Sequence, residues 1–132
     1  LASSAASDVY KRQEEIEADR VEIARQFAIK YKVVLVLKGA PTVVASPEGL
    51  AAVNYSGNEG MGTGGMGDTL TGIIASLLGQ GLEELEAAMV GVYLHGAAAD
   101  ELYEERNFGY TPSEVSRQLP YTMTELLDMD VE

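Results

Sequence analysis

The residues of this sequence best suited to chemistry form a glycine-rich segment that ends in an acid. The run Gly62-Thr63-Gly64-Gly65-Met66-Gly67 is followed at once by Asp68 and then by apolar residues at helical spacing. Glycine lets a backbone approach a ligand closely, and the N–H groups of a first helical turn bind anions with help from the helix dipole. A carboxylate beside a phosphoryl group can accept a proton from a substrate hydroxyl. The segment therefore indicates a phosphate-binding loop with a base, or else a plain glycine turn in which Asp68 is the helix N-cap.

Two familiar glycine motifs do not fit this segment. In a dinucleotide-binding fold the loop directly follows a strand, and the helix after it leads to another strand that ends in an acid. Here two helical patterns follow in succession, and no Gly-Lys-Ser or Gly-Lys-Thr of a nucleotide P-loop is present. The plain-turn interpretation stays open, although each glycine costs about 0.5 to 1 kcal/mol of backbone entropy relative to alanine and a cap needs few of them.

The elements predicted before the loop are an amphipathic helix and three strands. Apolar residues recur at helical spacing from Glu14 to Tyr31. The continuous apolar run Val33–Leu37 is typical of a strand covered on both faces, as in a parallel α/β sheet. Residues 42–45 and 50–54 predict two further strands, joined as a hairpin by the turn Ser46-Pro47-Glu48-Gly49.

Three helices are predicted after the loop. The first begins at the loop, is buried, and ends at Gly79 and Gly81. The second runs from about Glu83 to Arg106. The third begins at a capping box, Thr111-Pro112-Ser113-Glu114, and stops before Pro120, after which structure is marginal.

Composition and charge limit the ligand and the location. The formal net charge is −12, and only two of the nine basic residues, Arg106 and Arg117, follow Lys38. This acid excess argues against nucleic-acid binding, which requires a basic face. The sequence has no cysteine, so a reducing cytoplasm is the default location. The longest uncharged apolar run, Thr69–Leu82, is too short to span a membrane.

Three blocks of the sequence carry a family pattern in order and spacing. They are Val34–Thr42 with its Leu-Lys-Gly-Ala-x-Thr core, the long segment Asn58–Gly72, and Gly91–Gly96. Over about residues 19–99 the chain resembles the ADP- or ATP-dependent NAD(P)H-hydrate dehydratases of the ribokinase-like superfamily. Two positions depart from the family pattern: Glu59 stands where proline is usual, and Met66 where a smaller residue is common.

The resemblance implies the C-terminal portion of a ribokinase-like three-layer α/β/α fold. Residues 14–132 would form the partial domain. Residues 1–13, which show no clear periodicity, would be a disordered segment or a non-native one, such as a tag, an artefact or the scar of a truncation. The family's N-terminal half, which carries substrate-facing residues, does not match any part of this chain. A length of 132 residues, which alone suggests one complete small domain, is thereby interpreted as the later part of a larger one.

The function implied by the resemblance is cofactor repair. Family members convert hydrated NADH or NADPH back to the usable cofactor, a carbon–oxygen lyase reaction, and members of this type consume ADP and release AMP and phosphate. By analogy Asp68 would contact the substrate and act as the catalytic base. The adenine nucleotide would be held by Lys38, Gly39, Ala40, Pro41, Thr42, Gly64, Gly65 and Gly67. Mg²⁺ would accompany the nucleotide, and no protein metal site is predicted.

Two other functions stay open. The chain could belong to a ribokinase-like kinase of a vitamin, sugar or pyrimidine alcohol. It could also bind nucleotide without activity, or fold only as part of a homo-oligomer. The dehydratase, the kinase and the nucleotide-binding protein would each bind small-molecule ligands.

The remaining candidates are interpreted as structural. Lys38 is either a surface lysine at a strand end or a positive charge near phosphates. His95, the only histidine, is expected to pack in the structure, and Asn58 to support the loop by hydrogen bonds to the backbone. A solvated acidic helix face is expected for Asp100, Glu101, Glu104 and Glu105.

Overall fold

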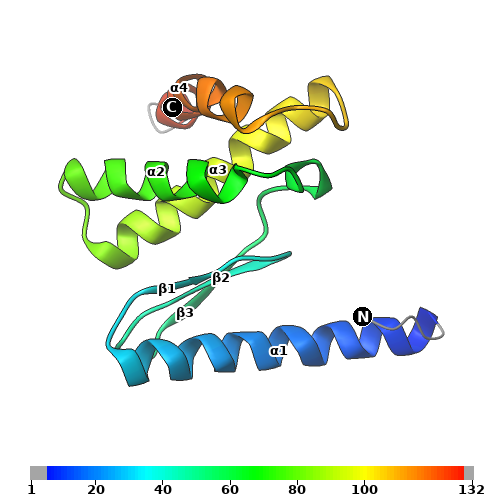
Figure 1. The fold of residues 1–132 in the computed structure, drawn as a ribbon, viewed down its shortest axis with the longest axis vertical. Coiled ribbons are helices and arrows are strands. Elements are labelled where there is room, and N and C mark those ends of the chain that lie inside the picture. The colour runs from blue at the N-terminus through cyan, green and yellow to red at the C-terminus, as the bar shows by residue number, and fades with distance from the viewer. Residues whose placement is uncertain (1–5, 130–132) are drawn as a thin grey trace. The chain divides into compact units, whose positions relative to one another are not determined.

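The computed structural model describes residues 6–129, with side chains described at residue 15 and from residue 17 onward. The chain forms two compact units, divided between Val53 and Asn54. The first unit contains one long helix and a small sheet, and the second contains the helices that follow the glycine loop (Figure 1). Each unit has its own cluster of buried apolar residues.

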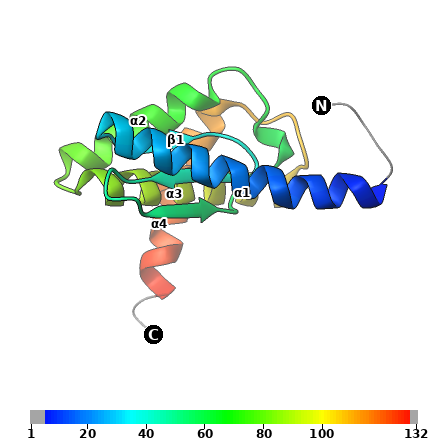
Figure 2. The ribbon, with the colours of Figure 1, turned by 90° about the horizontal axis from the view of Figure 1, so that it is seen from below.

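Helix α1 (Ala6–Tyr31) packs a stripe of small residues against the sheet. Ala24 and Ala28, one turn apart, are fully buried beside Val43. The helix begins eight residues before the predicted start at Glu14. Residues 6–13 are therefore helical, although they carry no apolar stripe, because lysine, arginine and glutamine there favour helix. Both views show this N-terminal part of α1 extending beyond the strands (Figure 2).

The sheet has three strands in the order β1-β2-β3. Their bounds are Leu35–Leu37 for β1, Thr42–Ala45 for β2 and Ala51–Asn54 for β3. The turn between β2 and β3 is closed by a hydrogen bond of 2.8 Å from the Ser46 N–H to the Leu50 carbonyl. The neighbouring positions of β2 and β3 confirm the predicted pairing of these two strands.

The prediction for β1 was wrong in its direction and its burial. The strand pairs antiparallel with β2, with Leu35 opposite Ala45, and each of its three residues is only half-buried. Helix α1 packs on this sheet, and Val33, at the start of the apolar run, is exposed. A continuous apolar run indicates that a strand contacts apolar neighbours, but the pairing direction depends on the connection, which here is a tight turn rather than a crossover helix.

The second unit is built around helix α3 (Glu84–Glu105), which agrees closely with the predicted range. α3 packs against both α2 (Met66–Gly79) and α4 (Pro112–Met129). Figure 2 shows α4 crossing the other two helices rather than running alongside them. Their shared core consists of Met66, Ala98, Ala99, Leu102, Tyr110 and Val115. Within residues 6–129, no helix combines the length and apolar character needed to cross a bilayer.

Helix α2 ends as the glycines predict. Gly81 has a φ of 99°, the left-handed conformation that favours glycine. The Gly81 N–H donates to the Leu78 carbonyl at 3.0 Å, and the Leu82 N–H donates to the Leu77 carbonyl at 3.2 Å. This pair of bonds is the Schellman motif, which satisfies carbonyls at a helix C-terminus.

Helix α4 begins as predicted but does not stop before Pro120. The Thr111 hydroxyl oxygen accepts a hydrogen bond from the Glu114 N–H at 3.3 Å, which is the N-cap interaction. The helix then continues through Pro120 to Met129. Thr122 explains the continuation, because it is buried against α3 and donates to the carboxylate of Glu101 at 3.0 Å. The free energy of this tertiary contact thus outweighs the cost of the backbone hydrogen bond that is lost at Pro120. Residues 130–132 of the predicted marginal segment lie outside the described residues.

Candidate functional site

The predicted nucleotide loop of the first unit, Lys38–Thr42, is closed by its own threonine. The Thr42 hydroxyl donates to the Gly39 carbonyl at 3.0 Å and accepts from the Gly39 N–H at 3.3 Å. The Ala40–Pro41 peptide bond is cis. Lys38, Gly39 and Ala40 are exposed, whereas Pro41 is buried. The loop therefore presents a fixed backbone and the Lys38 side chain to solvent.

Arg20, which the sequence patterns did not single out, holds this loop from helix α1. Its guanidinium donates to the carbonyls of Pro41 at 2.8 Å, Lys38 at 3.2 Å and Leu37 at 3.5 Å. A Cβ on Gly39 would collide with the same guanidinium. The five donors of arginine suit a site where several carbonyls converge. The loop is thus fixed by a residue that precedes it by about twenty positions, and the alternation of charges on α1 gave no signal for it.

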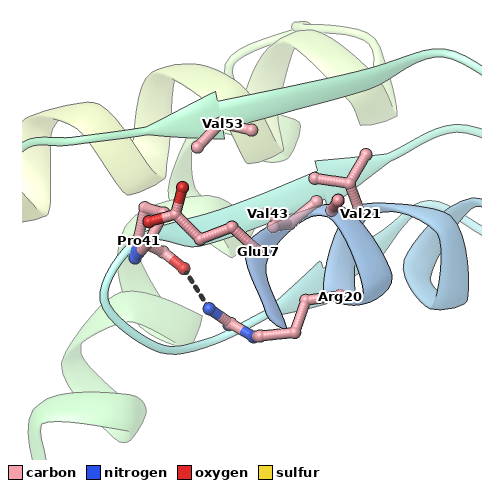
Figure 3. Close-up of a pocket in the computed structure, with 7 residues that line it drawn as sticks. Glu17, Arg20, Val21, Pro41, Val43 and Val53 are labelled. Carbon is pink, nitrogen blue, oxygen red and sulfur yellow. Dashed lines mark hydrogen bonds between the residues drawn. The ribbon is translucent and has the colours of Figure 1, made fainter. Parts of the chain in front are cut away.

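A pocket of about 330 Å³ lies beside the anchor formed by Arg20. Figure 3 shows Arg20 and Glu17 of α1 at its edge, with Val43 and Val53 of the sheet opposite. The dashed line in that view is the hydrogen bond from Arg20 to Pro41. Aliphatic side chains form most of the pocket wall, so it is suited to apolar contact rather than to phosphate binding.

The glycine loop of the second unit leads into α2 with no side-chain cap. Gly65 is the N-cap residue, in the left-handed conformation with a φ of 97°. Asp68 lies in the first turn of α2 and is exposed, so the alternative in which Asp68 is the N-cap is wrong. An ideal Cβ on Gly64 would meet no atom within 4 Å, so the space beside this backbone is open. The Met66 N–H donates to the Thr63 carbonyl at 3.4 Å, so the first turn offers the N–H groups of Gly67 and Asp68 to an anion, with the Asp68 carboxylate beside them.

The start of the same loop is held by Asp100 of α3. One carboxylate oxygen of Asp100 accepts from the Gly57 N–H at 3.0 Å, and the other accepts from the Asn58 side-chain amide at 2.8 Å. The side-chain oxygen Oδ1 of Asn58 in turn accepts from the Gly60 N–H at 3.0 Å and from the Tyr110 hydroxyl. The predicted role of Asn58 in supporting the loop is confirmed. Burial raises the pKa of the Tyr110 hydroxyl above its ordinary value, so this donor keeps its proton at neutral pH.

The prediction of a solvated acidic face on α3 is wrong for two of its four residues. Asp100 holds the loop, and Glu101 accepts hydrogen bonds from Gln118 and Thr122 of α4. Glu104 and Glu105 are exposed, as expected. No sequence pattern indicated the role of Asp100, because its partners Gly57 and Asn58 lie more than forty positions earlier in the chain.

Glu59 of the same loop has a hydrogen-bond partner of its own. The Tyr103 hydroxyl donates to its carboxylate at 2.9 Å. Its own backbone N–H and then Tyr103 lower the pKa of Glu59, and the same contact raises the pKa of Tyr103. His95 is buried within α3, which agrees with the predicted packing role.

The predicted site residues fall into two groups, one in each unit. Lys38, Gly39, Ala40, Pro41 and Thr42 belong to the first unit, and Gly64, Gly65, Gly67 and Asp68 belong to the second. Each group forms a compact loop with identifiable anchors. Among the described residues, no cluster of three or more histidine, aspartate or glutamate side chains could hold a metal ion.

Comparison with solved structures defines the class of protein. The chain matches an ADP/ATP-dependent NAD(P)H-hydrate dehydratase from Bacillus subtilis, co-crystallized with ATP/Mg²⁺, with a TM-score of 0.77 and 36% sequence identity. The match covers 85% of this chain and 41% of that one. The predicted ribokinase-like α/β class is confirmed by this likeness.

Comparison of sequences then defines the family. A family model described as NAD(P)H-hydrate dehydratase matches residues 4–121, and the chain belongs to this family. It is 55% identical over 91 residues to a bifunctional NAD(P)H-hydrate repair enzyme Nnr of Moorella thermoacetica, covering 69% of this chain and 17% of that enzyme. It is 49% identical over 90 residues to an ADP-dependent (S)-NAD(P)H-hydrate dehydratase of Neisseria meningitidis, covering 68% and 30%. The chain thus corresponds to less than one third of the length of either relative.

Proposed function

We propose that the protein to which this chain belongs is an ADP-dependent (S)-NAD(P)H-hydrate dehydratase, which repairs hydrated NADH and NADPH. The observation that carries the proposal is the exposed Asp68 carboxylate in the first turn of an uncapped helix that follows the glycine loop. A family match that includes this whole loop supports it, as do the names of the relatives.

The adenine nucleotide would be bound by backbone rather than by a cluster of cations. Lys38, Gly39, Ala40, Pro41 and Thr42 would hold the adenine nucleotide, and Gly64, Gly65 and Gly67 would contribute backbone to the binding of its phosphates. The open space at Gly64 and the missing side-chain cap of α2 fit an incoming phosphate. In a chain this acidic, Mg²⁺ bound with the nucleotide would screen the phosphate charge, and we assign it no protein ligand here.

Asp68 would act as the general base on the hydroxyl group of the hydrated nicotinamide ring. Its carboxylate accepts the hydroxyl proton, and the oxygen attacks the terminal phosphorus of ADP. The bond from that phosphorus to the bridging oxygen breaks and AMP leaves. The ring then loses phosphate from one carbon and a proton from the adjacent carbon, which restores the double bond. The protein's contribution is positioning and stabilisation of developing charge by fixed N–H donors.

The experiment uses the full-length protein and hydrated NADH. We expect the absorbance of reduced nicotinamide to return only when ADP is present, with AMP and phosphate formed in equal amounts. Accumulation of a phosphorylated vitamin, sugar or pyrimidine alcohol, with no action on hydrated NADH, would instead support the kinase alternative. If calorimetry showed binding of ADP but neither substrate were turned over, the result would support the alternative in which the protein binds nucleotide without activity.

Arg20 gives a test of the nucleotide loop itself. Replacing Arg20 with alanine removes three hydrogen bonds to carbonyls of the loop, and we expect the KM for ADP to rise about tenfold because the loop backbone is no longer fixed. Steady-state kinetics at varied ADP concentration measures the change.

Arg25 provides the matched control for this substitution. It lies on the same helix and also donates to a turn carbonyl, that of Gly49, at 2.8 Å. Arg25→Ala should lower stability without raising the KM for ADP. An equal rise in KM for both variants would show that the effect is general loosening of the first unit.

We also propose a cytoplasmic location, supported by the absence of cysteine from the sequence and by a substrate that arises from NADH and NADPH. Assembly as a homo-oligomer stays a prediction, which light scattering of the full-length protein tests.

A further inference from the structure

The glycine loop is fixed at both ends, and Asp100 holds the end that lies earlier in the chain. At the far end, Met66 begins α2 and is buried in the core of the second unit, beside Ala99 and Tyr110. At the near end, Gly57 and Asn58 are held by the Asp100 carboxylate. Between these ends, Gly62 and Gly64 are exposed. The exposed part of the loop, which would meet phosphate, therefore lies between two anchored ends.

The hydrogen bonds around Asp100 leave little freedom for substitution. Its two oxygens accept from two different donors, a backbone N–H and a side-chain amide. Asn58 connects Asp100 to further parts of the loop, because its Oδ1 atom accepts hydrogen bonds from the Gly60 N–H and the Tyr110 hydroxyl. Tyr110 is only 1% exposed and packs in the same core as Met66. Charge-assisted bonds of this kind are stronger than neutral ones and specify one geometry.

We propose that Asp100 is a positioning residue for the phosphate-binding loop, acting through Gly57 and Asn58 rather than by contact with the ligand. The proposal rests on the proposed function for its kinetic consequence, but the hydrogen bonds that it invokes can be observed without activity. With the loop preorganised, the nucleotide need not order it on binding, so the loss of this constraint weakens the affinity for ADP.

The test exchanges donor and acceptor between two side chains. Asp100→Asn places an amide donor against another donor, either the Gly57 N–H or the Asn58 amide. Asn58→Asp places two carboxylates face to face. In the double variant Asn58→Asp/Asp100→Asn, the new amide donates to the new carboxylate, and every other acceptor in the network is retained with the same total charge.

We measure kcat and KM for ADP in the full-length protein, together with hydrogen exchange of a peptide covering residues 57–66. Each single variant should raise the KM for ADP about tenfold and speed exchange of the loop amides, and the double variant should recover to within about threefold of the wild type. Glu104→Gln makes a similar chemical change at an exposed position four residues further along α3 and should leave both readouts unchanged.

The outcomes separate this proposal from the proposed function. An Asp100→Asn variant with wild-type exchange and wild-type KM would overturn the positioning role. A double variant no better than the single variants, in exchange as well as in KM, would also overturn it. If the wild-type protein lacks dehydratase activity, the exchange data still decide whether Asp100 orders the loop.

Discussion

Substitution of Asp68 by asparagine is expected to lower kcat for ADP-dependent dehydration about a thousandfold, because a positioned base contributes about 10² to 10⁴ in rate. The amide has nearly the size of the carboxylate but cannot accept the hydroxyl proton. Asp68 is exposed in the first turn of α2, so the fold should tolerate the change. The KM for ADP should change little, or fall as a negative charge near the phosphates is removed. Steady-state kinetics with hydrated NADH measures both constants.

Glu86→Gln is the matched control, because Glu86 is an exposed acid in the first turn of α3. Both substitutions remove one negative charge near a helix N-terminus, which costs about 0.3 to 1 kcal/mol of stability in each case. Only Asp68→Asn should impair turnover. If Asp68→Asn turned over hydrated NADH at the wild-type rate, the assignment of this residue as the base would be wrong, although nucleotide binding by the loop could still hold.

The features that sequence predicted well are those fixed by neighbouring residues. The range of α3 and the end of α2 follow from apolar periodicity and from glycine, whose preference for the left-handed conformation at Gly81 is a local property. The cap of α4 at Thr111 is equally local. The glycine loop and Asp68 were found for the same reason, since their spacing along the chain carries the signal.

The features that sequence missed depend on residues far apart in the chain. Arg20 contacts a loop that follows it by about twenty positions, and Asp100 contacts residues 42 and 43 positions before it. No local pattern distinguishes such an arginine or aspartate from the solvated charges around it. The continuation of α4 through Pro120 has the same origin, because a contact to α3 outweighs a local preference.

Gly96→Ala is expected to lower the free energy of unfolding by about 2 to 3 kcal/mol, the upper part of the range of about 1 to 3 kcal/mol for overpacking a well-filled core. An ideal Cβ on Gly96 would lie 2.5 Å from the Ser56 carbonyl carbon and 2.7 Å from the Gly57 nitrogen, and it would collide with the Ser56 hydroxyl. Two of these atoms are backbone, so a change of rotamer cannot relieve the contact. The segment that must move also carries the Gly57 N–H that Asp100 accepts. Urea denaturation of the full-length protein followed by circular dichroism measures the loss.

Gly72→Ala separates this steric effect from helix propensity. Gly72 also lies within a helix, and a Cβ there would meet no atom within 4 Å. Alanine should therefore raise the free energy of unfolding at Gly72 by about 0.5 to 1 kcal/mol, through helix propensity alone. Alanine at Gly96 also gains helix propensity, but this gain is smaller than the cost of displacing the backbone of Ser56 and Gly57. Two variants of equal stability would show that the approach of α3 to residues 56 and 57 is looser than the structure describes, and the role of Asp100 in holding that segment would lose its support.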